Sequence, residues 1–111
     1  SREKTVYYRG EEMTIDIKDF LEILKTKHIN IIDIRSKYIY DLSHIDKSLN
    51  IPYDYLVLSP SKYLNKNDTY YLYCQAGYTS KSISKKLNSL GYKTISVNGG
   101  YNSYKINSKR Y

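Results

Sequence analysis

The chain has 111 residues, the usual size of one domain with a single hydrophobic core, so we expect one domain. Its lone cysteine, Cys74, excludes an intramolecular disulfide and favours a reduced, cytoplasmic location. The formal net charge of +7 is spread over single lysines and short pairs, which argues against a nucleic-acid partner, and no apolar run approaches the roughly 20 residues of a membrane span.

The first half of the chain contains a predicted helix, a strand and a second helix. The chain begins at Ser1 rather than Met, so we interpret residues 1–12 as an N-terminal extension of uncertain origin and residues 13–111 as the domain. A helix is predicted where Asp16 can cap the first turn and apolar residues follow at i, i+3, i+4 and i+7: Ile17, Phe20, Leu21 and Leu24. Residues 29–34 are predicted as a buried strand, and Ser36 begins a short helix through about Leu42.

The second half repeats this alternation of strands and helices. A brief helix is expected over 53–58, a buried strand over 69–73, and a strand over 94–97 that Asn98 ends. Between the last two strands, Ile83, Leu87 and Leu90 have helical spacing, and Gly91 stands where a left-handed residue ends a helix. A short helix is expected over 101–105. The order of elements predicts an α/β domain with an open, mainly parallel sheet.

Three polar segments directly follow predicted strands. They are Asp33 to Arg35, Cys74 to Ser80, and Asn98 to Gly100. In an open α/β sheet, ligands bind in the crevice at the carboxyl ends of the strands. We therefore expect these three segments to meet at one site, although each alone is also typical of a simple connection.

Cys74 is the most informative residue of these segments. It precedes Ser80, which is placed as the N-cap or first residue of the next helix, and a helix N-terminus favours a negatively charged sulfur. Gly77 allows the intervening loop to turn so that its backbone N–H groups point inward and bind an anion. A buried cysteine with a purely structural role is the alternative interpretation.

The segment C-Q-A-G-Y-T-S at 74–80 resembles the active-site loop of the rhodanese family, whose first residue is the cysteine that becomes a persulfide. D-I-R at 33–35, S-H-I-D-K-S-L-N-I-P at 43–52 and V-N-G-G-Y-N-S-Y at 97–104 resemble three further motifs of this family, in the same order. The resemblance implies a rhodanese-like α/β fold, an open, mainly parallel sheet flanked by helices on both faces.

The chain departs from the family pattern at several positions. Lys47 and Ser48 stand where Gly and Ala are usual, Ser43 replaces a Gly, and Tyr104 replaces a Trp. In the loop, Gln75 and Thr79 stand where many members carry arginine. The loop therefore lacks a guanidinium for an anionic donor, and we expect weak binding of thiosulfate, with Lys81 or the loop amides as the remaining anion contacts.

The resemblance implies a sulfurtransferase that carries sulfane sulfur on Cys74. The sulfur would pass from a small donor such as thiosulfate to a thiol, a protein cysteine or cyanide, with no metal and no cofactor. The residues that would bind the substrate and the persulfide sulfur are those of the loop: Gln75, Ala76, Gly77, Tyr78, Thr79 and Ser80. Structural roles beside the site are expected for Asp33, Arg35, Gly99 and Gly100.

Some roles and functions stay open at this point. His44 is expected to pack and hydrogen-bond rather than catalyse, whereas Tyr78 and Tyr101 fit either the mouth of the site or ordinary exposed positions. A phosphatase or arsenate reductase is disfavoured because its C-x5-R signature needs arginine where Ser80 stands. A binding or redox-sensing module remains the alternative function. The physiological donor, the acceptor and the oligomeric state stay undetermined.

Overall fold

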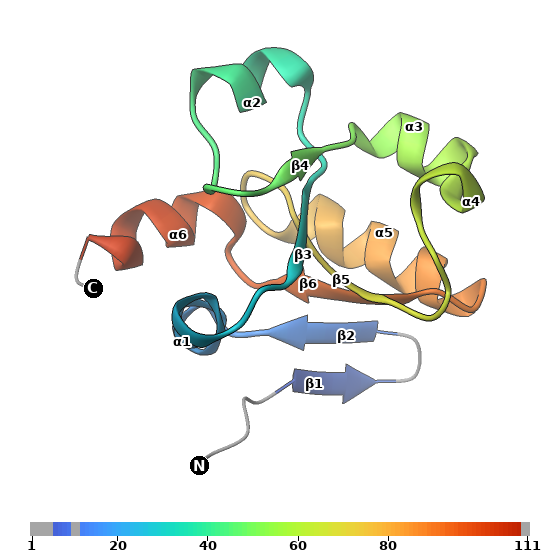
Figure 1. The fold of residues 1–111 in the computed structure, drawn as a ribbon, viewed down its shortest axis with the longest axis horizontal. Coiled ribbons are helices and arrows are strands. Elements are labelled where there is room, and N and C mark those ends of the chain that lie inside the picture. The colour runs from blue at the N-terminus through green and yellow to red at the C-terminus, as the bar shows by residue number, and fades with distance from the viewer. Residues whose placement is uncertain (1–5, 10–11, 110–111) are drawn as a thin grey trace.

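The computed structural model describes residues 6–9 and 12–109. Its strands are β1 (Val6–Arg9), β2 (Glu12–Ile15), β3 (Asn30–Asp33), β4 (Leu49–Asn50), β5 (Thr69–Tyr73) and β6 (Lys93–Val97). Its helices are α1 (Ile17–Thr26), α2 (Lys37–Leu42), α3 (Tyr53–Leu58), α4 (Pro60–Tyr63), α5 (Tyr78–Ser89) and α6 (Gly100–Ser108). The strands form one sheet in the order β1-β2-β6-β5-β3-β4 (Figure 1).

The sheet is mainly parallel, as predicted. β2, β6, β5, β3 and β4 run parallel to their neighbours, and β1 pairs antiparallel with β2 at one edge. The strands expected over 29–34, 69–73 and 94–97 are present as β3, β5 and β6. β1, β2, β4 and α4 were not predicted, because each has only two to four residues and shows no apolar run or helical period of its own.

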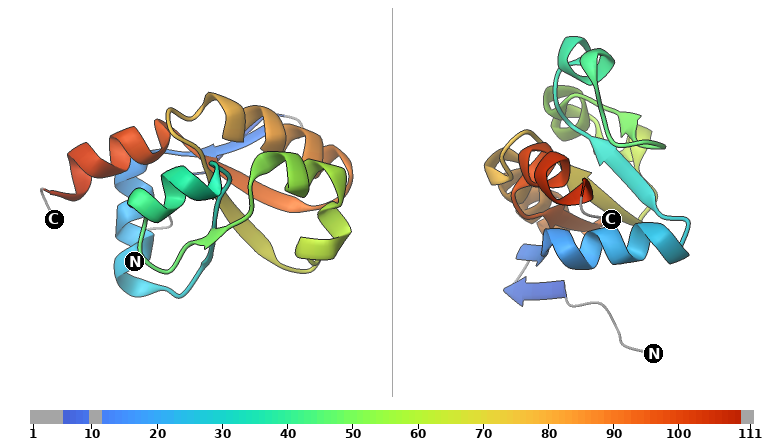
Figure 2. Two further views of the ribbon diagram at one scale, coloured as in Figure 1. Left: turned by 90° about the horizontal axis from the view of Figure 1, so that it is seen from above. Right: turned by 90° about the vertical axis from the view of Figure 1, so that its left-hand side faces the viewer.

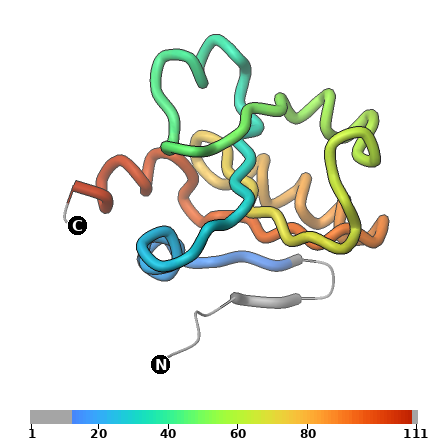
Figure 3. Tube along the Cα trace, viewed as in Figure 1, coloured from blue at the N-terminus to red at the C-terminus, as the bar shows by residue number. Residues whose placement is uncertain are grey.

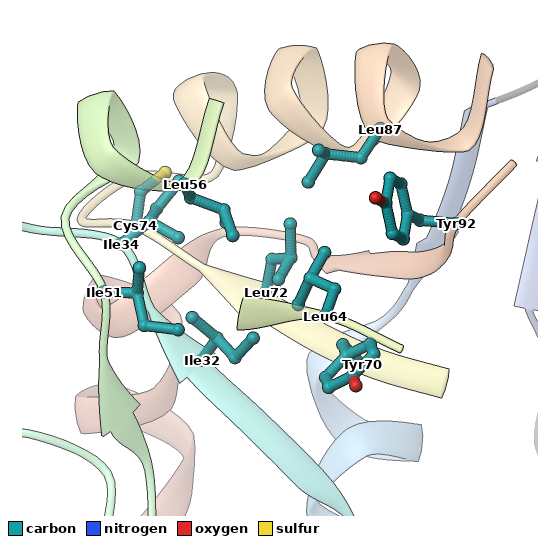
Figure 4. Close-up of a cluster of buried hydrophobic side chains, with 10 residues drawn as sticks. All are labelled: Ile32, Ile34, Ile51, Leu56, Leu64, Tyr70, Leu72, Cys74, Leu87 and Tyr92. Atoms are coloured by element: carbon teal, nitrogen blue, oxygen red, sulfur yellow. The ribbon is translucent and has the colours of Figure 1, made fainter. Parts of the chain in front are cut away.

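Two hydrophobic clusters cover the two faces of the sheet, because successive strand residues point to opposite faces. One lies under α3 and α5 and contains Ile32, Leu72 and Leu87, with Cys74 at one end beside Ile34 and Leu56 (Figure 4). The other lies under α1 and α6, which are neighbours (Figure 2), and contains Ile31, Phe20, Tyr73 and Tyr101. Helices therefore flank both faces, which confirms the expected fold class.

The predicted end of α5 is confirmed, whereas the predicted side-chain cap of α1 is not. Gly91 has φ +98°, the left-handed conformation expected after α5. Asp16 does occupy the N-cap of α1, but its side chain makes no capping hydrogen bond; its Oδ1 instead accepts from Nδ2 of Asn98, 3.2 Å away. The prediction of a side-chain cap was wrong because Asn98, 82 residues later in the chain, lies beside this carboxylate.

The strand register brings the predicted site segments to one edge of the sheet. Asp33 at the end of β3 lies opposite Tyr73 at the end of β5. Leu72 of β5 lies opposite Ser96 of β6. The residues that follow these strand ends therefore emerge side by side. The expected domain boundary at Met13 falls inside β2, and the interpretation of residues 1–12 as an extension stays a prediction that lies in part outside the described residues.

Candidate active site

The loop after β5 turns directly into α5 at Gly77. This glycine has φ +98° and is the N-cap, so α5 begins at Tyr78. The prediction that Ser80 is the N-cap or first helical residue was therefore wrong: the N-cap lies three residues before Ser80, and the first helical residue lies two before it. The reason is that Gly77 adopts the left-handed conformation at no steric cost, which allows the first turn of α5 to start immediately after it. Ser80 is instead the third residue of the helix, and its backbone N–H lies in the first turn.

The sulfur of Cys74 accepts hydrogen bonds from the start of this helix. The backbone N–H groups of Gly77 and Ser80 donate to Sγ over N···S distances of 3.2 and 3.3 Å. The hydroxyl of Ser80 lies 3.4 Å from the same sulfur. The Cys74 residue is 7 % exposed, and Ser80 is fully buried. Exposed amides at a helix N-terminus stabilise negative charge, so this arrangement favours an anionic sulfur.

Glycines at the starts of α5 and α6 allow this close packing. A Cβ on Gly77 would lie 2.8 Å from the backbone nitrogen of Gly99, and a Cβ on Gly100 would collide with the carbonyl oxygen of Cys74. The N–H groups of Tyr101 and Asn102 donate to the carbonyl oxygens of Cys74 and Gln75, at 2.9 and 3.0 Å. These hydrogen bonds therefore fix the loop to the first turn of α6; Figure 3 shows the loop next to the start of this helix.

Asp33 and Arg35 form a buried ion pair next to the loop. Nη2 of Arg35 donates to Oδ2 of Asp33 at 2.7 Å, and Nε contacts both carboxylate oxygens at 3.0 and 3.1 Å. The guanidinium lies 4.3 Å from the ring centroid of Tyr101 and also donates to the carbonyl of Ser43. These contacts hold the loop after β3 against α6.

Gln75 connects this ion pair to α6. Its Oε1 accepts from Nη1 of Arg35 at 3.0 Å, and its Nε2 donates to Oδ1 of Asn102 at 2.6 Å. Both polar ends of the side chain are therefore engaged within the protein. A role for Gln75 in binding substrate, as proposed from the motif, would have to come from its backbone.

The other predicted residues divide between the surface and the interior. Ala76, Tyr78 and Thr79 are exposed at the start of α5, and Tyr78 is 82 % exposed. Tyr101 is only 7 % exposed and packs on Arg35, so the alternative of an ordinary exposed aromatic is wrong for it, and a place at the mouth of the site stays a prediction. His44 stacks on Tyr40 with 3.7 Å between ring centroids, and its Nδ1 lies 2.7 Å from the Tyr40 carbonyl oxygen.

Ser96 is a buried polar residue at this site that the sequence motifs did not indicate. Its Oγ lies 2.8 Å from that of Ser80. A detectable signal existed, since Thr94 and Ser96 interrupt an apolar strand on one face, while Ser80 and Ser84 occur at i and i+4 on the following face of α5. Two polar positions on a strand and two on the helix that covers it indicate paired hydroxyls.

The described ranges, 6–9 and 12–109, contain no group of three or more His, Cys, Asp or Glu side chains able to hold a metal ion. Over the same ranges, no helix combines the length and apolar character that a membrane crossing requires.

Comparison with known proteins relates the chain to one family. The family model described as "Rhodanese-like domain" matches residues 16–107. Among curated proteins, the chain is 29 % identical over 92 residues to "Adenylyltransferase and sulfurtransferase uba4" of Sclerotinia sclerotiorum. That alignment covers 74 % of this chain but 20 % of the fungal protein, so the chain spans about one fifth of the length of this relative.

Solved structures of similar size share the fold. A rhodanese-related protein from Thermoplasma volcanium is 27 % identical with a TM-score of 0.75, and the match covers 89 % of this chain and 92 % of that one. A rhodanese-like domain protein from Staphylococcus aureus is 25 % identical with a TM-score of 0.75, with coverage of 82 % and 89 %.

Proposed function

The chain belongs to the rhodanese-like domain family, and from this membership we propose that it is a sulfurtransferase that carries sulfane sulfur as a persulfide on Cys74. The observation that carries the proposal is the pair of N–H groups, from Gly77 and Ser80, that donate to Sγ. They stabilise the thiolate that attacks and the persulfide anion that forms. The name of the fungal relative, which includes sulfurtransferase, supports the same class of reaction.

The reaction has two steps. In the first, the thiolate of Cys74 attacks the outer sulfur of a donor such as thiosulfate; a new S–S bond forms, and the donor's S–S bond breaks. Sulfite leaves with the electron pair of that bond. In the second step, the thiolate of an acceptor, or cyanide, attacks the terminal sulfur of the persulfide. The Cys74 thiolate departs with the electron pair, and the enzyme returns to its first state.

The proposed role of the residues around Cys74 is to stabilise negative charge on its sulfur during the reaction. The N–H groups of Gly77 and Ser80 point at the sulfur of Cys74, so in the proposed thiolate state negative charge lies against fixed dipoles. We assign no general base, because a thiolate needs none to attack. The acceptor is proposed to be a small thiol or a protein cysteine, and the reaction to take place in the cytoplasm, where thiols stay reduced.

Mass spectrometry of the intact protein after treatment with thiosulfate tests the proposal. We expect Cys74 to gain the mass of one sulfur atom while an equal amount of sulfite is released from thiosulfate. The added mass should be lost when a thiol or cyanide is added. Cys74→Ser should retain the fold and the melting temperature but take up no sulfur, because the replacement is nearly isosteric and Cys74 has no disulfide partner.

Two results would contradict the proposal. One is thiosulfate-to-cyanide sulfur transfer by Cys74→Ser at the rate of the parent protein. The other is a parent protein whose Cys74 takes no sulfur from thiosulfate or from a low-molecular-weight persulfide but is oxidised reversibly by peroxide. The second result would favour a redox-sensing module.

A further inference from the structure

Two buried serine hydroxyls and the sulfur of Cys74 form a continuous chain of contacts. The Oγ of Ser80 lies 3.4 Å from Sγ on one side and 2.8 Å from the Oγ of Ser96 on the other. Ser96 is on β6, opposite Leu72 of β5 and outside the loop. Both serines are fully buried. We call these two residues the Ser80–Ser96 pair.

We propose that Ser96 is a positioning residue, whose hydroxyl orients the Ser80 hydroxyl toward the sulfur when Cys74 is negatively charged. The inference deepens the proposed function and rests on it for its catalytic meaning. It adds a second, interior layer to the N–H groups that already contact the sulfur, and it assigns a role to a residue outside the loop.

Each serine hydroxyl has a single hydrogen to donate. When Cys74 carries its proton, the thiol donates to Ser80, and Ser80 is free to donate to the Gly77 carbonyl, 3.3 Å away, or to Ser96. When Cys74 is a thiolate, the Ser80 hydroxyl must donate to the sulfur instead. The 2.8 Å contact between the serines then needs a hydrogen from Ser96. Ser96 is therefore the donor that the charged state requires.

Because the site is buried, the hydrogen bond donated by Ser96 to Ser80 affects the stability of the thiolate. Both side chains are fully buried, so a missing hydrogen bond is not replaced by bulk water. Among the residues that the structure describes, Ser80 is the hydrogen-bond partner of the Ser96 hydroxyl. Hydrogen bonds in such a chain also polarise one another, so donation by Ser96 strengthens donation by Ser80. Removal of the Ser96 hydroxyl therefore weakens the support for the thiolate without a direct change at the sulfur.

The same helix and strand contain a matched control. Ser84, one turn further along α5, and Thr94 on β6 place their hydroxyl oxygens 2.6 Å apart. Ser84 is as buried as Ser80, but this second pair contacts Asn88 rather than the sulfur. Ser84→Ala and Ser96→Ala each remove one hydroxyl from a buried helix-to-strand pair, and only Ser96→Ala alters the pair that reaches Cys74.

The test is the rate at which iodoacetamide alkylates Cys74, measured as a function of pH. At neutral pH we expect Ser96→Ala to react about threefold to tenfold more slowly than the parent, as for the loss of one supporting hydrogen bond. At strongly alkaline pH the two rates should converge, and Ser84→Ala should follow the parent throughout. The variants add or remove no ionisable group, so every such group on the elements around Cys74 stays in place, among them Asp33, Arg35, Asp54, Tyr73, Tyr78, Lys81 and Tyr101.

A double-mutant comparison separates positioning from a general loss of packing. If Ser96 acts through Ser80, Ser96→Ala should slow alkylation in the parent but have no further effect in Ser80→Ala. Equal slowing in both backgrounds, or an unchanged rate in the Ser96→Ala single variant, would overturn the proposal. Should Ser96→Ala fail to fold, Ser96→Thr and Ser96→Val replace it. They have the same shape, and only the threonine, which keeps the hydroxyl, should react at the parent rate.

Failure of this proposal is distinguishable from failure of the proposed function. Alkylation requires no sulfur donor, so the comparison of Ser96→Ala with Ser84→Ala decides the role of Ser96 even if Cys74 takes up no sulfur. If Cys74 does take up sulfur, Ser96→Ala should slow persulfide formation by the same factor as alkylation. Slow alkylation together with an unchanged rate of persulfide formation would show that Ser96 has no part in sulfur transfer.

Discussion

At the scale of single residues, the described groups that contact the sulfur of Cys74 are dipoles rather than charged groups. Gly77 and Ser80 contribute N–H groups, and Ser80 contributes a hydroxyl. Arg35 is close by, but its guanidinium is committed to Asp33, Ser43 and Gln75. The site thus suits a singly charged sulfur, and residues 6–9 and 12–109 provide no paired guanidinium contact at the loop for a dianion such as thiosulfate.

Thr79→Arg is expected to lower the KM for thiosulfate about tenfold, since a hydrogen bond to a charged group contributes about 1.5 to 3 kcal/mol. Thr79 is exposed, so the longer side chain can be accommodated. The gain should shrink with added salt, because screening acts within about 8 Å at physiological ionic strength. Steady-state kinetics with thiosulfate and cyanide measures the effect, and Tyr78→Arg, one residue away and also exposed, is the control. An unchanged KM in Thr79→Arg would mean that donor binding depends on another surface.

At the scale of elements, the site is a junction of β5, the start of α5 and the start of α6. At Gly77 in this junction, both the backbone conformation and the close contact with α6 disfavour a side chain. Gly77 has φ +98°, which disfavours any side chain, and its hydrogens face the backbone of Gly99. Gly91 at the end of α5 has the same φ of +98°, but the atoms nearest to a Cβ there belong to the flexible side chain of Lys66, the first at 3.4 Å.

This pair of glycines allows strain and packing to be measured separately. Gly91→Ala should lower the free energy of unfolding by about 1 to 2 kcal/mol, the cost of the left-handed conformation. Gly77→Ala should cost about 2 to 5 kcal/mol, because displacement of the α6 N-terminus adds to the same strain. Urea denaturation measures both changes. Gly77→Ala, and not Gly91→Ala, should also alter the alkylation rate of Cys74. Equal costs in the two variants would show that the contact with Gly99 relaxes freely.

At the scale of the whole molecule, several tyrosines act as core residues that join the layers. Tyr73 is fully buried, and its hydroxyl accepts from the N–H of Ile45 at 3.0 Å. Burial, together with the neighbouring carboxylate of Asp33, raises the pKa of Tyr73. Burial likewise raises the pKa values of Tyr71 and Tyr104. The neutral phenol is thus favoured in the folded protein.

The fold should therefore lose stability in alkaline solution. The folded-state pKa of Tyr73 lies above its usual value of 10.0, so its contribution is complete below that pH and is lost as the pH rises above it. Above pH about 10, Tyr73→Phe should reduce the slope of unfolding free energy against pH by about 1.4 kcal/mol per unit. Urea denaturation at a series of pH values measures the slope. Tyr78→Phe, at an exposed position, should leave it unchanged, and an equal slope in Tyr73→Phe and the parent would contradict this account.

The sequence by itself determined the parts of this protein that depend on neighbouring residues. Apolar runs identified β3, β5 and β6, the spacing of Ile83 and Leu87 identified α5, and the segment 74–80 indicated both the family and the cysteine. These features can be predicted from the sequence because the side-chain period of a strand or helix repeats within a few residues. β1, β2 and β4 escaped detection because such short strands are defined by their partners.

Only the tertiary structure decided which groups reach the sulfur. It placed the start of α5 at Tyr78. It also showed the contact of Ser96 with Ser80 and the hydrogen bonds of Gln75 to Arg35 and Asn102, which join residues from different elements. Such contacts depend on the register between strands and on how closely α6 approaches the loop, which Gly99 and Gly100 permit. A motif shows that a cysteine, a glycine and a serine occur in order, but strand register and helix packing determine their distances, and those distances determine the chemistry of the sulfur.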